Sequence, residues 1–501
     1  MNRNKYKHIM VSLAISALLL AGLFLLQNQV LHIARADPGE WFVKPNGTGS
    51  ACTPAHPCAL PDALSKATDG DTVYVARGTY TGTGSAVITI TKSITLYGGW
   101  AGTTATPPVR DPSLYPTRLD GENARRVVYV GEGITPTIDG FIIARGNASN
   151  GINPGRGGGI CASDASPVVT NNVITNNVAY TSTNNWGYGG GIYLGYTSAP
   201  ALISGNLVVS NTANGMGPGK GGGLYVTYAS ATIHDNTFRG NIAGYGENGM
   251  GGGLCLYRIE SQTTVSGNRI EHNKGTASGE GFGGGFYSQI GTVTLEGNTI
   301  VSNTAAQGAV TLEQNDNMTM TNNVVAQNAG GGVFVRGNAS YPFAGTLAHN
   351  TIAQNGSEGV YVDYSHSGYA ALTLINNVIV SHTTGIYSYQ DLVNPNVVTA
   401  THTLFYGNGI NTSGSLITNT DEIAGSNPLF VDPAGWDYHI AGNSPAVDHG
   451  TALSWVVTDV DGEPRPSSAG NDPAVARYDI GADEVQWKYV YVPLVMKRRN
   501  L

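Results

Sequence analysis

Three segments of this chain, 27 and 26 residues apart, each place an aromatic residue two positions before a polar one. They are Phe334-Val-Arg336, Tyr361-Val-Asp363 and Tyr387-Ser-Tyr389. His366 and Asp391 follow shortly after the second and third segments. If the segments stack on one another, a guanidinium, a carboxylate and a phenol come to lie beside three aromatic rings. This is the densest set of potentially catalytic side chains in the repeated part of the chain.

Three interpretations of these residues are open. A polysaccharide lyase needs a cation that neutralises a uronate carboxylate and a base that removes the adjacent proton. Arg336 could supply the cation, and Tyr389 or His366 the base. A glycoside hydrolase needs two carboxylates flanking the bond, and Asp363 with Asp391 is the pair that the sequence offers nearby. In the third interpretation Arg336 and Asp363 form an ion pair between neighbouring strands, with no catalytic role.

A repeated pattern, Asn-x-(Ile/Val/Phe)-x-x-Asn, must position these side chains. Its copies begin at Asn172, Asn206, Asn236, Asn268, Asn298, Asn323, Asn350, Asn377 and, in degenerate form, Thr403. The spacing of 25 to 34 residues indicates a solenoid or a propeller. The apolar runs are short, β-branched and alternating, so they predict strands rather than helices. Propeller blades need about 40 residues. We therefore predict an all-β fold, a right-handed parallel β-helix solenoid.

Asparagine and glycine mark the bends of each coil. Asparagines at the same bend of successive coils lie about 4.8 Å apart, so each amide can bond to the backbone or to the next asparagine. Such a ladder satisfies polar groups that would otherwise be unpaired inside the bend. The glycine runs supply positive φ or close backbone approach where a coil turns into a strand.

An aligned column of residues is expected two positions after the last turn glycine of each coil. Stacked strands place these side chains in one outward-facing column: Cys161, Tyr193, Tyr225, Cys255, Tyr287, Phe334, Tyr361 and Tyr387. One interpretation is that the exposed rings stabilise adjacent strands by packing on one another. The other is a sugar-binding platform formed by the aromatic members of the column.

The four cysteines divide into two pairs. Cys52 and Cys58 lie in a short loop, CTPAHPC, and in an exported protein they are expected to form a disulfide. Cys161 and Cys255 hold the same slot three coils apart, about 14 Å, which is beyond disulfide reach. We predict that both are free thiols. We expect no metal at these cysteines.

Charge limits the partners. The formal net charge is -8, and it becomes -12 if the four basic residues ahead of Asp37 are removed. An acidic surface argues against nucleic acid and anionic membrane as partners. Seven basic residues are scattered between positions 151 and 410. A groove that holds a polyanion usually concentrates positive charge, so this scatter weighs against a lyase.

Residues 130 to 410 resemble the right-handed parallel β-helix proteins of the pectate-lyase-like superfamily. The alternation of GGGI or GGGL with (Ile/Phe)-x-x-Asn is also similar to the repeats of bacterial polymorphic outer-membrane proteins. The resemblance implies the fold. It leaves the function open, because this fold carries lyases, hydrolases, epimerases and non-enzymatic adhesins.

The two ends differ from the repeat. Residues 1–36 resemble a signal peptide, with cleavage expected after Ala36 and a retained membrane anchor as the alternative. Residues 37–97 are expected to form an N-terminal cap and the first coils, with a short helix over PDALSKA that covers the open end. Residues 98–425 hold the parallel β-helix repeats.

The repeat stops near residue 425. Residues 426–486 resemble the choice-of-anchor Q region of bacterial exported β-helix proteins, and we expect them to form a C-terminal capping region. Residues 487–501 form a tail with too few apolar residues to span a bilayer. Its role could be in sorting, or it could form a last edge strand. The stretch DVDGE, from Asp459 to Glu463, resembles the start of a calcium loop but lacks its later ligands, so no cofactor is expected beyond calcium there.

These observations favour an exported cell-surface or secreted protein, monomeric, that binds a polysaccharide or cell-surface glycan or acts as an adhesin. The alternatives are a polysaccharide lyase or glycoside hydrolase on the same scaffold, and a purely structural surface protein. Candidate catalytic residues are Arg336, Asp363, His366, Tyr389 and Asp391, and candidate ligand-binding residues are Phe334, Tyr361, Tyr387, Tyr193, Tyr225 and Tyr287. We expect no nucleic acid partner and no membrane insertion of the mature chain.

Overall fold

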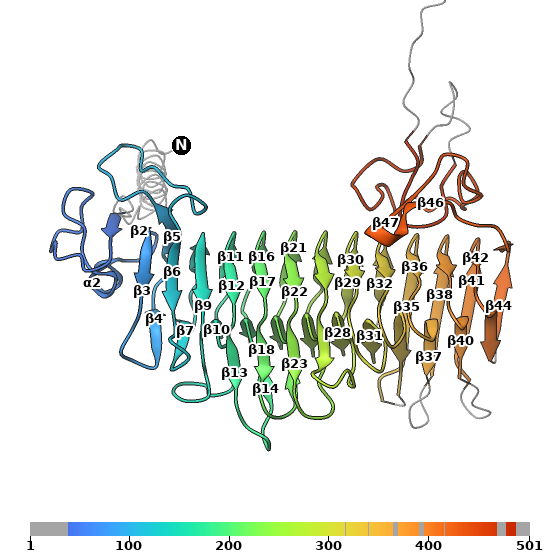
Figure 1. The fold of residues 1–501 in the computed structure, drawn as a ribbon, viewed down its shortest axis with the longest axis horizontal. Coiled ribbons are helices and arrows are strands. Elements are labelled where there is room, and N and C mark those ends of the chain that lie inside the picture. The colour runs from blue at the N-terminus through green and yellow to red at the C-terminus, as the bar shows by residue number, and fades with distance from the viewer. Residues whose placement is uncertain are drawn as a thin grey trace, which may run out of the picture.

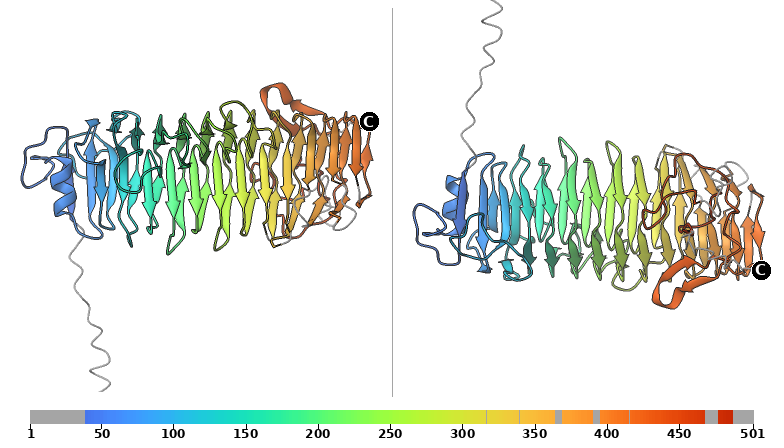
Figure 2. Two further views of the ribbon diagram at one scale, coloured as in Figure 1. Left: turned by 90° about the horizontal axis from the view of Figure 1, so that it is seen from below. Right: turned by 90° about the horizontal axis from the view of Figure 1, so that it is seen from above.

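The chain winds into a right-handed parallel β-helix, as the repeat predicts (Figure 1). The computed structural model describes residues 39–315, 317–338, 340–363, 369–389, 395–414, 416–467 and 477–486. Within these residues three long parallel sheets run side by side along the molecule, and each coil contributes one strand to each sheet. The views in Figure 2 show the coils stacked from the N-terminal cap to the last strands, which gives a long, narrow molecule.

The first sheet has 14 strands among the described residues. In order they are β1 (Glu40–Val43), β2 (Thr72–Ala76), β5 (Thr95–Trp100), β8 (Thr137–Asp139), β11 (Val168–Thr170), β16 (Ala201–Ser204), β21 (Ala231–His234), β25 (Thr263–Ser266), β29 (Val293–Glu296), β32 (Met318–Thr321), β35 (Phe343–Ala348), β38 (Ala370–Ile375), β41 (Val397–Thr401) and β44 (Ile417–Thr420).

The second sheet, with 12 strands in the described part of the chain, carries the aromatic column. Its order is β4 (Ala86–Ile90), β7 (Arg126–Val130), β10 (Ile160–Ser163), β15 (Ile192–Gly195), β20 (Leu224–Thr227), β24 (Leu254–Tyr257), β28 (Phe286–Gln289), β31 (Val310–Glu313), β34 (Val333–Arg336), β37 (Glu358–Asp363), β40 (Thr384–Ser388) and β43 (Ile410–Gly414).

The third sheet has 13 strands over the same residues. Its order is β3 (Gly78–Tyr80), β6 (Thr117–Asp120), β9 (Phe141–Ala144), β12 (Val173–Thr175), β17 (Leu207–Val209), β22 (Thr237–Arg239), β26 (Arg269–Glu271), β30 (Thr299–Val301), β33 (Val324–Ala326), β36 (Thr351–Ala353), β39 (Val378–Val380), β42 (Leu404–Tyr406) and β45 (Ile423–Ala424).

Short sheets form where the bends of neighbouring coils pair. One contains β13 (Val178–Tyr180), β18 (Thr212–Asn214), β23 (Ile242–Gly244) and β27 (Lys274–Thr276), and another pairs β14 (Gly187–Tyr188) with β19 (Gly219–Lys220). Near the C-terminus β46 (Phe430–Asp432) and β47 (Asp437–Ile440) are antiparallel, joined by the 3-10 turn η1 (Pro433–Gly435).

Alternation along each strand builds the core. In β15, Ile192 and Leu194 point into the solenoid and are buried among aliphatic side chains from all three sheets. Their counterparts stack on them coil after coil, because the strands pair in register. Each coil therefore buries its apolar face only with its neighbours' help, and a single coil has no core of its own.

The asparagine pattern forms two ladders, as predicted. The Asn241 backbone N–H and side-chain Nδ2 both donate to Oδ1 of Asn273, one coil later, at 2.9 and 3.0 Å. The same Nδ2 also donates to the Val208 carbonyl, one coil earlier, at 2.9 Å. A parallel ladder joins the first asparagine of each copy, for example Asn236 to Asn268. Each amide thus bridges three coils at a buried bend.

The N-terminal end carries the expected helical cap. Helix α2 (Leu60–Lys66) has proline at its second residue and Ala67 as its C-cap, and its Leu60 and Ala63 are buried. Figure 1 shows the helix at the N-terminal end of the solenoid. The predicted Cys52–Cys58 disulfide is present beside it. Cys161 and Cys255 are both free and buried, which confirms the second cysteine prediction.

The region after the last coil caps the side of the solenoid rather than its end. We call the described residues of 426–486 the C-terminal cover. Figure 1 shows it lying across several coils of the last third of the molecule. Its apolar residues, including Tyr438, Ile440 and Ile480, pack on the outer face of the third sheet over β30, β33, β36, β39 and β42. The shared core explains why a segment with so little regular structure folds there.

The expected signal peptide at residues 1–36 and the tail at 487–501 lie outside the described residues. Among the residues that are described, none of the helices is both long enough and apolar enough to cross a bilayer.

Candidate functional site

Strand register brings Arg336 between two carboxylates. Glu313 of β31, Arg336 of β34 and Asp363 of β37 occupy the same slot on three consecutive coils. Arg336 Nε and Nη2 donate to Asp363 Oδ2 at 3.0 and 2.8 Å. Arg336 Nη1 donates to Glu313 Oε1 at 3.3 Å. The predicted cross-strand ion pair is therefore present, and a second acid extends it.

Further contacts saturate the guanidinium. Arg336 Nη2 also donates to the side-chain oxygen of Gln307 at 3.3 Å. The guanidinium carbon lies 4.8 Å from the centre of the Phe334 ring and 5.8 Å from that of Phe282. Held on two acids and against two rings, Arg336 has little freedom to reach a ligand carboxylate.

Glu313 is the buried member of the network. It is 6% exposed, and its Oε2 accepts a hydrogen bond from the Tyr287 hydroxyl at 2.9 Å. Burial raises the pKa of the Glu313 carboxyl, while Arg336 and Tyr287 oppose that rise. A buried carboxyl group beside a second carboxylate is an arrangement that can separate an acid from a base.

Sequence reasoning missed Glu313. Its coil, Gln307 to Glu313, has one glycine where most coils have three, so a count from the glycine run skips it. The usable signal is the 25-residue step of the asparagine pattern between Asn298 and Asn323. That step indicates that a coil lies between these two copies. In the structure Val310 of this coil pairs with Phe286 and Val333, and Glu313 lies opposite Arg336.

Most of the aromatic column is not exposed, contrary to the prediction. The column points away from the main core, yet Tyr193, Tyr225, Tyr287 and Phe334 are only 0 to 4% exposed. The bends of the coils fold back over it, and Tyr188, Met250 and Phe282 pack against it from outside. These bends pair with one another through β14, β19 and the bridges at Met250 and Phe282. The first part of the column is a second, smaller core and offers no sugar platform.

The rings become accessible at the C-terminal end of the column. Tyr361 and Tyr387 pair in register on β37 and β40 and are partly exposed. Their ring centres are 5.1 Å apart, with the planes inclined at 46°. Tyr389 follows β40 and is 42% exposed. A cavity of about 100 Å³ lies on the Tyr361 side of this pair, and Gln307, Phe334, Glu358 and Tyr361 itself form part of its lining.

Whether the last two predicted catalytic residues join this patch is not tested. His366 and Asp391 lie outside the described residues, so neither the lyase base nor the hydrolase pair that includes them is tested. Tyr361 donates from its hydroxyl to Asp363 Oδ1 at 3.1 Å. Burial and the neighbouring Asp363 raise the pKa of the Tyr361 phenol, so it keeps its proton and is a poor base.

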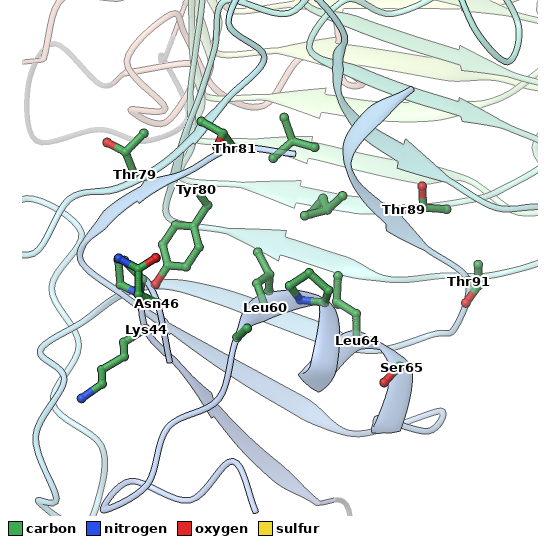
Figure 3. Close-up of a pocket in the computed structure, with 15 residues that line it drawn as sticks. Lys44, Asn46, Leu60, Leu64, Ser65, Thr79, Tyr80, Thr81, Thr89 and Thr91 are labelled. Atoms are coloured by element: carbon green, nitrogen blue, oxygen red, sulfur yellow. The ribbon is translucent and has the colours of Figure 1, made fainter. Parts of the chain in front are cut away.

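A larger hollow lies at the other end of the molecule. Between α2, β3 and β4 is a cavity of about 510 Å³, and its lining includes Leu60 and Leu64 of the helix and Tyr80 of β3 (Figure 3). Its other lining groups are mainly aliphatic side chains and threonine hydroxyls, with Lys44 at its edge. The cavity occupies the place that a preceding coil would fill, and its lining holds no acid–base pair.

The stretch from Asp459 to Glu463 forms a tight turn. Asp459 Oδ1 accepts hydrogen bonds from the backbone N–H groups of Asp461 and Glu463 at 3.0 and 2.9 Å. Its other oxygen accepts from the Glu484 N–H at 3.2 Å. Asp459 therefore closes the turn with one oxygen and binds the stretch at Glu484 with the other.

Comparison with known proteins identifies the fold and no activity. A family model described as right handed beta helix region matches residues 182–348. No curated protein matches the chain. Pectate lyase Pel9A is 14% identical over 90% of this chain and 97% of its own length, at a TM-score of 0.42. XylC, solved with xylose, is 10% identical over 88% of this chain and 98% of its own, at a TM-score of 0.45.

The alginate lyase AlyGC, of family PL6, is 15% identical over 87% of this chain. The match covers 60% of the lyase, at a TM-score of 0.45. At these identities and scores the solved structures carry no argument about reaction or ligand.

Proposed function

We propose that this protein is an extracellular or cell-surface binding protein whose ligand is a neutral glycan, held over Tyr361, Tyr387 and Tyr389. One observation carries the proposal. The acid–base groups of the patch are bound to one another, while its aromatic rings remain accessible. Arg336 is held by Asp363 and Glu313, whereas the paired rings of Tyr361 and Tyr387 are partly exposed, and Tyr389, two residues after Tyr387, is 42% exposed.

Aromatic rings suit a sugar ligand because the faces of pyranose rings are apolar and pack on them, while the hydroxyl edges need polar partners. Gln307 and Glu358 line the adjoining cavity and offer such partners. The rigid strands β37 and β40 hold the two paired rings at a fixed angle, which lowers the entropy cost of binding.

The local charge favours a neutral ligand. Two carboxylates, Glu313 and Asp363, share the single guanidinium of Arg336, and the Glu358 carboxylate lies nearby in the cavity lining. The described part of the patch therefore has a negative balance. A uronate polymer would be repelled there, whereas a neutral polysaccharide would not.

A glycan array probed with the chain from Asp37 onward tests the proposal. Tyr387→Ala should weaken the binding of any glycan found by roughly two- to tenfold, because a packed ring contributes ~0.5–1.5 kcal/mol. Tyr196→Ala is the matched control, since Tyr196 is an exposed tyrosine stacked on Tyr228 with ring centres 5.2 Å apart, elsewhere on the surface. If the control loses binding and Tyr387→Ala does not, the site is wrong. If no neutral glycan binds the parent chain, the proposed function is wrong.

A glycoside hydrolase is the second candidate, because Glu313 and Asp363 are two carboxyl groups on one guanidinium and the pKa of Glu313 is raised. In that role Glu313 would be the acid and Asp363 the base or nucleophile. The glycans that bind should then release new reducing ends on incubation, and Glu313→Gln should stop the release. If glycans bind and no product forms, the hydrolase is wrong and the binding function remains.

A further inference from the structure

The C-terminal cover brings one histidine and two aspartates together from three separate segments. His439 lies in β47, Asp461 in the turn after Asp459, and Asp483 in the final described stretch, 477–486. One ligand atom from each lies within 4.8 Å of the other two. His439 Nε2 and Asp461 Oδ2 are 2.6 Å apart. The site is independent of the tyrosine patch and of the proposed glycan function.

Asp483 is the member that calls for an explanation. It is only 8% exposed, yet it takes part in no ion pair among the described residues. One of its oxygens accepts a hydrogen bond from the Ile440 N–H at 2.8 Å. Among the described residues its other oxygen accepts no hydrogen bond, and it is not one of the fully buried unpaired atoms, so it is accessible to water or to an ion. A buried carboxylate without a cation is costly, and proteins pair such groups or place them on a metal.

Among the described residues no arginine or lysine pairs with Asp483, and His439 is the basic group that lies nearest to it. Asp459, Asp479 and Glu484 are also buried nearby. Arg465 is the one buried basic residue in the described part of the cover, and its Nη1 pairs with Glu484 Oε2 at 2.9 Å. The described cover therefore buries more carboxyl groups than basic groups, and Asp483 has a carboxylate oxygen within 4.8 Å of His439.

We propose that His439 Nε2, Asp461 and Asp483 bind a divalent transition-metal ion of the zinc class. One imidazole nitrogen and two carboxylate oxygens are a donor set suited to zinc, with water in the fourth position. Calcium takes oxygen ligands, so the histidine disfavours it. Asp437 Oδ1 lies 2.5 Å from His439 Nδ1. A carboxylate on the far nitrogen is the usual means of fixing the orientation of a ligating histidine.

The ligands need only a small movement to accept the ion. Two donors of a tetrahedral zinc site lie roughly 3.3 Å apart, given metal–ligand bonds of about 2.0–2.1 Å. The Asp461 side chain is 50% exposed and stands on a turn, so it can move away from His439 by that small amount. The same exposure gives the ion a path from solvent.

The ion would act as a cross-link. The described cover has one two-stranded sheet and shares its apolar core with the solenoid. A metal would tie β47 to the turn at Asp461 and to the stretch at Asp483, which no disulfide in the described residues does. Small segments that lack a large core of their own often depend on such a link.

Metal binding to the full chain, free of any histidine tag and stripped with a chelator, tests the proposal. Titration with Zn²⁺, followed by calorimetry and by metal analysis after gel filtration, should give one ion per chain, and the melting temperature should rise with Zn²⁺ concentration. Asp483→Asn and His439→Gln should abolish the binding, and Asp437→Asn should weaken it about 10- to 100-fold. Asp461→Asn changes an exposed side chain, so it reports binding even if a buried substitution disturbs folding.

His234→Gln is the matched control, because His234 also pairs with an aspartate, Asp235 at 2.8 Å, but has no third ligand in the described structure. It should bind zinc as the parent does. No binding by the parent, binding that survives in both His439→Gln and Asp461→Asn, or a response to Ca²⁺ alone would overturn the proposal. The cluster would then be an ion pair of His439 with Asp437 and Asp461.

Discussion

At the scale of single residues, His382 shows how the ladder tolerates a substitution. It takes the place of asparagine between Asn355 and Asn408 in the second ladder. Its backbone N–H donates to Asn408 Oδ1 at 3.0 Å, and its Nε2 lies 3.3 Å from Asn355 Nδ2. Burial lowers the pKa of His382 to about 4. The imidazole is therefore neutral in the folded chain where a free histidine would already be charged.

This depressed pKa predicts a pH-dependent stability. The contribution of neutral His382 to the free energy of unfolding is fully present above the unfolded-state pKa of about 6.5. It is lost as the pH falls toward the folded-state pKa. His382→Asn removes the titration and restores the ladder. Between about pH 7.5 and about pH 5, the free energy of unfolding should fall by roughly 2 kcal/mol more in the parent than in the variant.

Guanidinium unfolding of both proteins at the two pH values measures the effect. All other titrating groups are common to the two chains, so their contributions cancel in the comparison. A difference in stability that does not change with pH would contradict the neutral, buried state of His382.

The candidate site was predictable only in part at this scale. The pairing of Arg336 with Asp363 follows from the repeat, because both stand two positions after a column residue. Glu313 did not follow, since its coil lacks the glycine run from which the column was counted. The pKa of Glu313 and the saturation of Arg336 depend on distances within a few ångströms, which the repeat alone does not supply.

At the scale of the element, the glycine triplet shows why successive coils can lie so close. Gly251 has a φ of +65°, which favours glycine, and Gly252 has no room for a side chain. A Cβ at Gly252 would lie 2.3 Å from the Lys274 carbonyl oxygen and 2.4 Å from that of Gly284. Both oxygens belong to the backbone of the next coil, so relief requires the coils to separate.

Gly252→Ala should therefore destabilise the solenoid by at least ~2 kcal/mol, as overpacking against backbone does. Gly84→Ala is the matched control, since a Cβ there meets only the Ala86 oxygen at 3.8 Å. The control should be unchanged or more stable by ~0.5 kcal/mol. Chemical unfolding measures the stability of both variants. If Gly252→Ala and Gly84→Ala are equally stable, neighbouring coils can separate more easily than these contacts indicate.

The strands, the ladders and the cap helix were predictable, because each follows from residues within one coil and its copies. The burial of the aromatic column was not. It depends on bends such as Thr212 to Lys220, whose glycines and asparagine indicate only a turn. That these turns pair with the turns of neighbouring coils through β18 and β19, and so close over Tyr193 and Tyr225, is a relation between coils.

At the scale of the whole molecule, the C-terminal cover and the solenoid share one apolar interface. Val301, Val378 and Leu404 of the third sheet pack against Ile440 and Ile480 of the cover. Trp436 of the cover extends this contact one coil further, to Arg269 of β26, whose guanidinium carbon lies 5.0 Å from the Trp436 ring. The last third of the rod therefore depends on a segment that comes after it in the chain.

A chain that ends at Gly425 should keep its parallel β-structure, since the coils stack on one another without the cover. It should melt at a lower temperature and bind a hydrophobic dye, because the valines of β30, β33 and β39 become exposed. Circular dichroism, thermal melting and dye fluorescence on both chains measure this. Complete loss of β-structure, or a chain that melts and binds dye as the parent does, would contradict the lateral role of the cover.

Because the cover lies on the side of the solenoid, the coils beneath it must form before it can dock. Each coil needs only the one before it, so the rod can grow from its N-terminal end as the chain is synthesised. The cover reaches back 136 residues to the side chain of Asn322 and 75 residues to that of Asn376. The cover can dock only after those coils have formed, and until then the valines of β30, β33 and β39 are exposed to water. Docking of the cover is therefore the final step of assembly, and it buries the outer face of the third sheet on coils that have already formed.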